Sequence, residues 1–196
     1  MPYEEYLSAG MHIGMKQQNK SMKKFVYKIR DDGLAILDLQ TIEKRIKLAG
    51  KFLARFNKIM VASRKSVGWK AVIKFAEVIK GKDVTGRFLP GTITNPYFPG
   101  YYEPDVLVVT DPLVDSQAVK EAEKMRIPIV ALCDTSNKTE SVDLIIPVNN
   151  KGRKSIAMVY YLLAMEILKN RGEIKEDKEF KHKIEDFMME EAKKEE

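Results

Sequence analysis

Short runs that are apolar at every position alternate with amphipathic segments along most of this chain, and this alternation constrains its fold more than any other feature. The runs fall at residues 59–62, 106–109, 129–132 and 144–148. A strand that is apolar at every position has both faces covered, whereas a strand with one wet face alternates apolar and polar residues. The sequence therefore predicts an α/β fold in which a parallel, doubly wound sheet lies between helix layers.

The segments between the runs have the periodicity of helices. The first is predicted to begin at a capping residue, Thr41, and the last to be buried on most sides because it is apolar almost all round from residue 156 to 165. The predicted helices are marked by Ile42, Ile46, Ala49, Leu53 and Phe56; by Val67, Ala71, Phe75, Val78 and Ile79; by residues 116–125; and by residues 152–170.

The predicted α/β body spans residues 25–172, begins with a hairpin, and has an arm before it and a charged tail after it. Residues 1–24 have weak periodicity and predict an irregular arm that follows a partner's surface. Residues 25–39 alternate apolar and basic side chains around an Asp-Asp-Gly turn, which predicts a hairpin with a cationic face. The charged tail, 173–196, keeps a few apolar residues at helical spacing, so it is either a solvated tail or a short helix that docks on the body or on a partner.

Charge is distributed unevenly over the 196 residues. The formal net charge is +6, but residues 173–196 carry −4, so the chain before the tail carries +10. Such an excess is typical of a protein with a polyanionic partner, and a merely solvated surface is the alternative.

Several functional classes lack their usual residues. The single cysteine, Cys133, lies in an apolar run and is expected to be a buried thiol, and the two histidines, His12 and His182, are too far apart to predict a metal site. No G-x-G-x-x-G follows a predicted strand, and Pro147 stands where a P-loop needs glycine, so we expect no cofactor. The start lacks a signal-peptide pattern and the longest apolar stretch is too short for a bilayer, which predicts a cytoplasmic location away from membranes.

Residues 86–96, Gly-Arg-Phe-Leu-Pro-Gly-Thr-Ile-Thr-Asn-Pro, predict an ordered surface loop because two glycines and two prolines exclude a helix or a long strand. Its polar groups come from Arg87, Thr92, Thr94 and Asn95, and they suit phosphate and ribose oxygens. The alternative is a tight connection with two turns and no ligand.

The start of the last predicted helix holds Lys151, Arg153 and Lys154. The helix dipole is already positive there, so each cation is disfavoured by about 0.3 to 1 kcal/mol unless a negative charge is near. A backbone phosphate would supply that charge, although the side chains could also extend into water.

Two other functions stay open at this point. Asp111 and Asp134 each follow a predicted strand, where ligands of parallel sheets gather, so an enzyme acting on a phosphorylated small molecule is possible; both are also suited to cap turns. The tail could instead make the chain a protein adaptor. Basic residues interleaved with aromatics, such as Lys24, Phe25 and Tyr27, favour irregular RNA.

Several motifs together resemble the family of the second protein of the small ribosomal subunit, from about Tyr6 to Ile174. They are His12-Ile13-Gly14; Met22 to Lys28 with Arg30 and Gly33; residues 86–96; Glu103-Pro104-Asp105; Thr110-Asp111-Pro112; Pro128 to Ala131; and Asn149 to Arg153. The long helical insert of the bacterial branch is missing, so the chain is most similar to the archaeal and eukaryotic branch, which includes the laminin-receptor-like protein. The eukaryotic tail extension is missing too, which favours an archaeal origin.

The resemblance implies a flavodoxin-like fold and a structural, non-enzymatic role in the cytoplasmic ribosome, with small-subunit ribosomal RNA and neighbouring ribosomal proteins as partners and no small-molecule substrate. The predicted RNA contacts are His12, Lys16, Lys20, Lys23, Lys24, Tyr27, Lys28, Arg30, Arg64, Arg87, Thr92, Thr94, Asn95, Asn149, Asn150, Lys151, Arg153 and Lys154.

Overall fold

The computed structural model describes residues 3–175 and 179–188. In this part of the chain the strands form a five-stranded parallel sheet in the order β4-β3-β5-β6-β7 and a two-stranded hairpin of β1 and β2. The strands are β1 (Val26–Ile29), β2 (Ala35–Leu37), β3 (Ile59–Ser63), β4 (Lys82–Thr85), β5 (Val106–Val109), β6 (Ile129–Cys133) and β7 (Leu144–Pro147). The helices are α1 (Tyr3–Ser8), α2 (Leu39–Leu53), α3 (Trp69–Ile79), α4 (Ser116–Lys124), α5 (Arg153–Arg171) and α6 (Ile184–Phe187).

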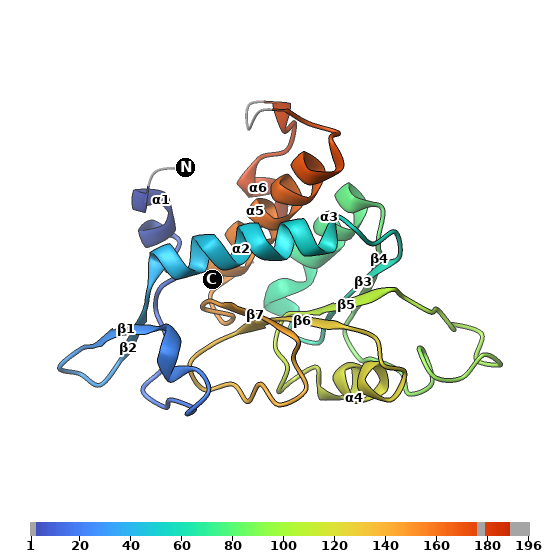
Figure 1. The fold of residues 1–196 in the computed structure, drawn as a ribbon, viewed down its shortest axis with the longest axis horizontal. Helices are drawn as coiled ribbons and strands as arrows, with labels where there is room; N and C mark the ends of the chain where they lie inside the picture. The colour runs from blue at the N-terminus through green and yellow to red at the C-terminus, as the bar shows by residue number, and fades with distance from the viewer. Residues whose placement is uncertain (1–2, 176–178, 189–196) are drawn as a thin grey trace, which may run out of the picture.

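The sheet lies between two helix layers, which confirms the predicted flavodoxin-like α/β fold. α2, α3 and α5 cover one face, and α4 covers the other together with the long connection between β4 and β5 (Figure 1). β3, β5 and β6 are buried at every position, as expected for strands covered on both sides.

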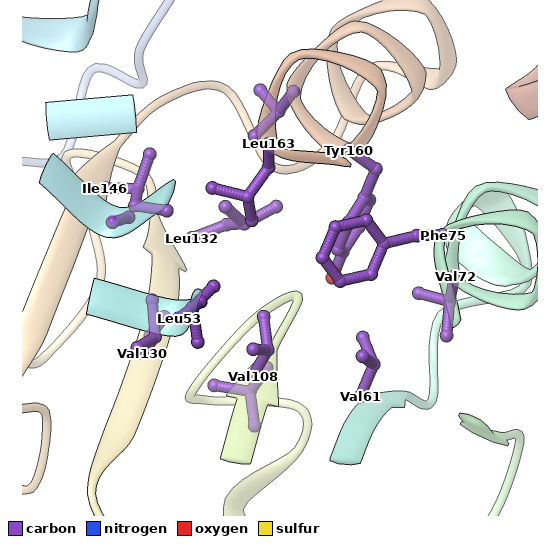
Figure 2. Packing of buried hydrophobic residues seen from close by; sticks show 14 of the residues in the cluster. Leu53, Val61, Val72, Phe75, Val108, Val130, Leu132, Ile146, Tyr160 and Leu163 are labelled. Atoms are coloured by element: carbon purple, nitrogen blue, oxygen red, sulfur yellow. The ribbon is translucent and has the colours of Figure 1, made fainter. Parts of the chain in front are cut away.

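The core is formed where α3 and α5 meet the upper face of the sheet. Figure 2 shows Val61 and Val108 from the strands facing Phe75 of α3 and Tyr160 of α5. The rings of Phe75 and Tyr160 lie 5.0 Å apart. The Tyr160 hydroxyl is fully buried and lies 2.8 Å from the hydroxyl of Thr110, so the largest core side chain keeps a hydrogen bond.

The start of α2 and the edge of the sheet differ from the predictions. Asp38, not Thr41, is the N-cap of α2, because its carboxylate accepts hydrogen bonds from the backbone N–H groups of Gln40 and Thr41. β4 was not predicted at all. Its sequence, Lys82 to Thr85, begins with two charged residues that an edge strand tolerates because one side of it faces water.

The arm packs on the body. Residues 3–8 form α1, and Met11 and Met22 are fully buried in the core, whereas the sequence predicted an irregular arm outside it. Gly14 lies against β2 and Thr135, where an added Cβ would come within 2.6 Å of the threonine methyl group, so only glycine fits. The arm is therefore fixed to the protein without a partner.

Part of the tail also docks on the body. Phe180 and Phe187 are buried and make edge-to-face contacts with Tyr161 of α5, with ring centroids 5.2 and 5.8 Å apart. α6 is a single helical turn that contacts α3 and α5. These aromatic residues are used within the chain, which disfavours both a fully solvated tail and an adaptor that offers them to a partner. Residues 176–178 and 189–196 of the predicted tail lie outside the described residues.

Candidate nucleic-acid interface

The carboxyl ends of the parallel strands meet at one edge of the sheet, and the predicted cations collect there. Arg64 directly follows β3, and Arg87 follows the neighbouring strand β4. Both side chains are exposed and line a pocket of about 290 Å³ with Ser116 and Gln117 from the start of α4. This brings together two guanidinium groups from positions that are 23 residues apart in the sequence.

At the other end of this edge, the start of α5 follows β7. Arg153 and Lys154 are exposed, and no carboxylate of the described residues forms an ion pair with either of them. Lys151 differs, since its ammonium group lies 3.7 Å from the buried carboxylate of Asp134. The protein therefore supplies a counter-charge for one of the three cations that the sequence placed at the positive end of the helix dipole.

The arm lies across the ends of β6 and β7 and adds cations there. Thr135 accepts a hydrogen bond from the backbone of Met15 at 2.8 Å, and its carbonyl accepts one from Asn19 at 2.7 Å. Lys16 and Lys20, between and beside these contacts, are exposed. This edge of the sheet thus carries a set of exposed basic residues that we call the carboxyl-edge cations: Arg87, Arg64, Lys151, Arg153, Lys154, Lys16 and Lys20.

Beneath this edge, a buried polar network joins the strand ends. Asp111 forms an ion pair with Lys65 and accepts a hydrogen bond from the Asn137 amide at 2.8 Å. The Asn150 amide donates to the Leu132 carbonyl at 2.9 Å and to the Asn137 carboxamide oxygen at 3.0 Å. The network ties β3, β5, β6 and β7 together and holds the backbone that presents the cations.

Several predicted RNA contacts face the protein instead of solvent. Asn150 is fully buried in the network described above, and Thr92 is 8% exposed with its hydroxyl bonded to the Leu89 carbonyl. Asn149 holds the turn that leads into α5, since its carboxamide oxygen accepts the N–H groups of Lys151 and Gly152 at 3.0 and 3.2 Å. Their polar groups match what RNA recognition uses, but here they stabilise turns and helix ends.

Two aromatics of the basic segments are core anchors. Phe25 and Phe88 are buried, with 4% and 8% of their surface exposed, so their faces are not free for bases. Lys24 and Arg45 lie over the ring of Phe25 at 5.1 and 5.3 Å, which holds the root of the hairpin. Tyr27, in contrast, is 72% exposed.

The loop of residues 86–96 is held by one carboxylate of α4. Glu121 is 4% exposed and accepts hydrogen bonds from Gly91 N at 2.9 Å, Ile93 N at 3.2 Å, the Thr94 hydroxyl at 3.3 Å and the Gln117 amide at 2.9 Å. Burial by itself raises the pKa of this carboxyl, but the hydrogen bonds outweigh it, so the pKa lies below its usual range. The loop that presents Arg87 is thus rigidly positioned.

Two residues that matter here were missed by sequence reasoning. Tyr97, one residue beyond the predicted loop, is 93% exposed and extends a flat aromatic face next to the exposed Asn95. An aromatic after an Asn-Pro pair was the available signal. Glu121 had none, because an acidic residue on an amphipathic helix normally faces water.

The hairpin and His12 do not belong to the carboxyl-edge cations. Lys23, Lys24, Lys28 and Arg30 are exposed, and Arg30 forms a surface ion pair with Asp32 at 3.3 Å. His12 is half-buried, its Nδ1 has no hydrogen-bond partner among the described residues, and burial lowers its pKa.

Comparison with known proteins decides the family. The family model described as Ribosomal protein S2 matches residues 6–97 and 101–170, which include all the strands of the sheet. The chain belongs to the ribosomal protein S2 family. Small ribosomal subunit protein uS2 of Thermoplasma acidophilum is 52% identical over 189 residues, covering 95% of each chain. The uS2 protein of Ignicoccus hospitalis is 55% identical over 180 residues, covering 90% of this chain and 85% of that protein. Both of these relatives are archaeal, in agreement with the predicted branch.

None of the helices in residues 3–175 and 179–188 combines the length and the apolar character needed to cross a membrane. The same residues hold no group of three His, Cys, Asp or Glu side chains arranged for a metal ion.

Proposed function

We propose that this chain binds small-subunit ribosomal RNA along the carboxyl edge of its sheet and so supports subunit assembly and translation. As a member of the S2 family it is a structural constituent of the small ribosomal subunit, in the cytoplasm, where ribosomal RNA and other ribosomal proteins are its partners. The observation that carries the choice of surface is the row of exposed cations, from Arg87 to Lys20, on one edge of a chain with net charge +6.

Rigid presentation supports this proposal. The loop with Arg87 is clamped by Glu121, and the turn before Arg153 is held by Asn149, whose carboxamide oxygen accepts the N–H of Gly152. Cations fixed in place before binding lose little conformational entropy when they meet phosphates, so more of the electrostatic attraction becomes affinity. The arginines provide planar, paired donors for phosphate oxygens, and Tyr97 provides a face on which a splayed base can stack.

A role without catalysis is part of the proposal. The carboxylates of Asp111 and Asp134, the candidates for an enzyme, are 3% and 1% exposed and are bonded to Lys65 and to the backbone of Thr135. A general acid or a metal ligand must reach a substrate, and these groups are turned into the polar network. The Cys133 thiol is fully buried and burial raises its pKa, which removes it as a nucleophile.

The test is the salt dependence of RNA binding. Replacing Arg153 and Lys154 by alanine should reduce the slope of log K against log salt concentration by about 0.7 to 0.9 for each phosphate contact that is lost. The matched control replaces Lys51 and Arg55 by alanine. These are an exposed lysine and arginine near the end of α2, on the other side of the molecule from the carboxyl ends of the strands. An unchanged slope in the first variant, or an equal change in both variants, would contradict this interface.

A further inference from the structure

A groove of about 630 Å³ lies between the arm, the hairpin and the start of α2, apart from the carboxyl-edge cations. Leu7 of α1 and Tyr27 of β1 form two of its walls, and Ile36, Leu37 and Leu39 lie along it. In Figure 1 these elements meet at the end of the molecule where the hairpin projects from the body. The groove is therefore built by three segments that pack together only in the folded chain.

Its apolar surface is open. Leu7 is 48% exposed and Tyr27 is 72% exposed, while the nearby Ile13 and Ile29 are 39% and 57% exposed. Single exposed apolar residues are ordinary, but a contiguous set that lines a concave surface is typical of a binding site. Among the described strands, β1 pairs only with β2, so its other edge also has unpaired backbone groups.

The rim of the groove is cationic. Lys28 and Arg30 line it, and Arg30 also forms a surface ion pair with Asp32 at 3.3 Å. The carboxylate of Asp38, which lines the groove as well, is occupied by capping α2 and by bonding the Thr41 hydroxyl. A partner that is apolar along its centre and acidic at its flanks complements both features.

We propose that this groove binds an apolar segment with acidic flanking residues from a neighbouring protein of the small subunit. The inference rests on the proposed function, since it takes the ribosomal subunit as the setting. It assigns Tyr27, Lys28 and Arg30, predicted as RNA contacts from the sequence, to a protein partner.

The chemistry of the groove favours protein over RNA. RNA offers phosphates, hydroxyls and flat bases, and the aliphatic side chains of Leu7, Ile36 and Leu39 complement none of them. Covering aliphatic surface with a peptide removes it from water, which is favourable, whereas covering it with phosphates is not.

The test uses intact small subunits that carry the full chain with a photoreactive phenylalanine analogue at position 27. After irradiation, the adduct should be sensitive to protease and resistant to ribonuclease, and sequencing should give a small-subunit protein segment rich in apolar and acidic residues. The same analogue at position 97, in the loop of the proposed RNA surface, should instead give an RNA adduct. An RNA adduct at position 27, a segment without acidic residues, or no adduct would overturn the proposal.

Two variants separate the groove from the RNA surface. Leu7→Glu should lower the yield of the position-27 adduct about fivefold, the loss expected when half a leucine side chain is no longer buried. Lys28→Glu should lower it through repulsion of the acidic flanks. Neither variant should change the affinity for ribosomal RNA by more than its change in net charge explains, which is −1 for Leu7→Glu and −2 for Lys28→Glu. Failure of the RNA adduct at position 97 would speak against the proposed function and leave the groove result readable.

Discussion

Replacing Glu121 by glutamine tests whether one buried carboxylate positions the loop that presents Arg87. The carboxylate accepts four hydrogen bonds, two on each oxygen: Gly91 N and the Gln117 amide on Oε1, Ile93 N and the Thr94 hydroxyl on Oε2. Glutamine has the same shape but only one acceptor oxygen. Whichever way its amide turns, an NH₂ group then faces one backbone N–H of the loop.

The expected cost follows from that mismatch. A buried backbone N–H left without an acceptor costs about 1 to 3 kcal/mol, and the remaining hydrogen bonds weaken because they are no longer made to a charge. We therefore expect E121Q to lower the free energy of unfolding by about 2 to 4 kcal/mol. Glu121 is 4% exposed, so solvent cannot replace the lost acceptor.

Urea unfolding measures the loss in the free energy of unfolding of the whole protein, and amide hydrogen exchange at Gly91 and Ile93 measures the local opening of the loop. Both amides should exchange faster in the variant, and RNA affinity should fall because Arg87 is no longer held. Glu123→Gln is the matched control, since this exposed carboxylate on the same helix accepts one hydrogen bond, from the Ser141 hydroxyl at 3.0 Å; its effect should stay within about 0.5 kcal/mol. Wild-type stability together with wild-type exchange at both amides in E121Q would refute the reasoning.

Three further predictions concern other parts of the fold. Burial raises the pKa of Asp115 to about 6, so this carboxyl holds its proton more tightly in the folded protein than in the unfolded chain, and its contribution to stability falls as the pH rises from roughly 4 to 6. Asp115→Asn should therefore reduce this fall in the free energy of unfolding measured with urea, and an unchanged pH dependence would contradict it. A Cβ at Gly50 would lie 2.5 Å from Cβ of Glu166, so Gly50→Ala should force α2 and α5 apart and cost about 1 to 3 kcal/mol; a rise in thermal midpoint would show that the contact is not close. Phe187→Ala should release the tail from Tyr161 and lower the free energy of unfolding by about 3 to 5 kcal/mol if the site does not collapse. Limited proteolysis should then cut the tail of the variant, and equal resistance to protease in the variant and the wild type would argue against docking.

The central strands could be predicted from the sequence because a strand that is buried on both faces needs an apolar residue at every position. β3, β5 and β6 were found within one residue of their bounds for this reason. β4 could not, since an edge strand needs no such run and begins with Lys82 and Asp83. The packing of the arm could not either, because several of its hydrogen bonds join backbone groups to residues more than 100 positions away, and these leave no local pattern.

The site was predictable in its charges and less so in its polar side chains. Arg64, Arg87, Arg153 and Lys154 are exposed as expected, since long cationic side chains extend into water almost wherever they stand. Asn149 and Asn150 are adjacent and chemically identical, yet one holds the turn before α5 and the other lies in the buried network. Only the tertiary structure decides which acceptors surround each amide. Whether the exposed residues contact RNA stays a prediction.

Two hydrogen bonds of the arm join residues 120 and 139 positions apart, Met15 with Thr135 and Gly10 with Asn149. During synthesis the first segment to emerge therefore cannot complete its docking until most of the chain has been made. At translation rates of about 5 to 20 residues per second, that interval is on the order of 10 s. The nascent protein spends it with Met11 and Met22 uncovered, a period in which a chaperone or an early RNA contact has access to side chains that the finished molecule hides.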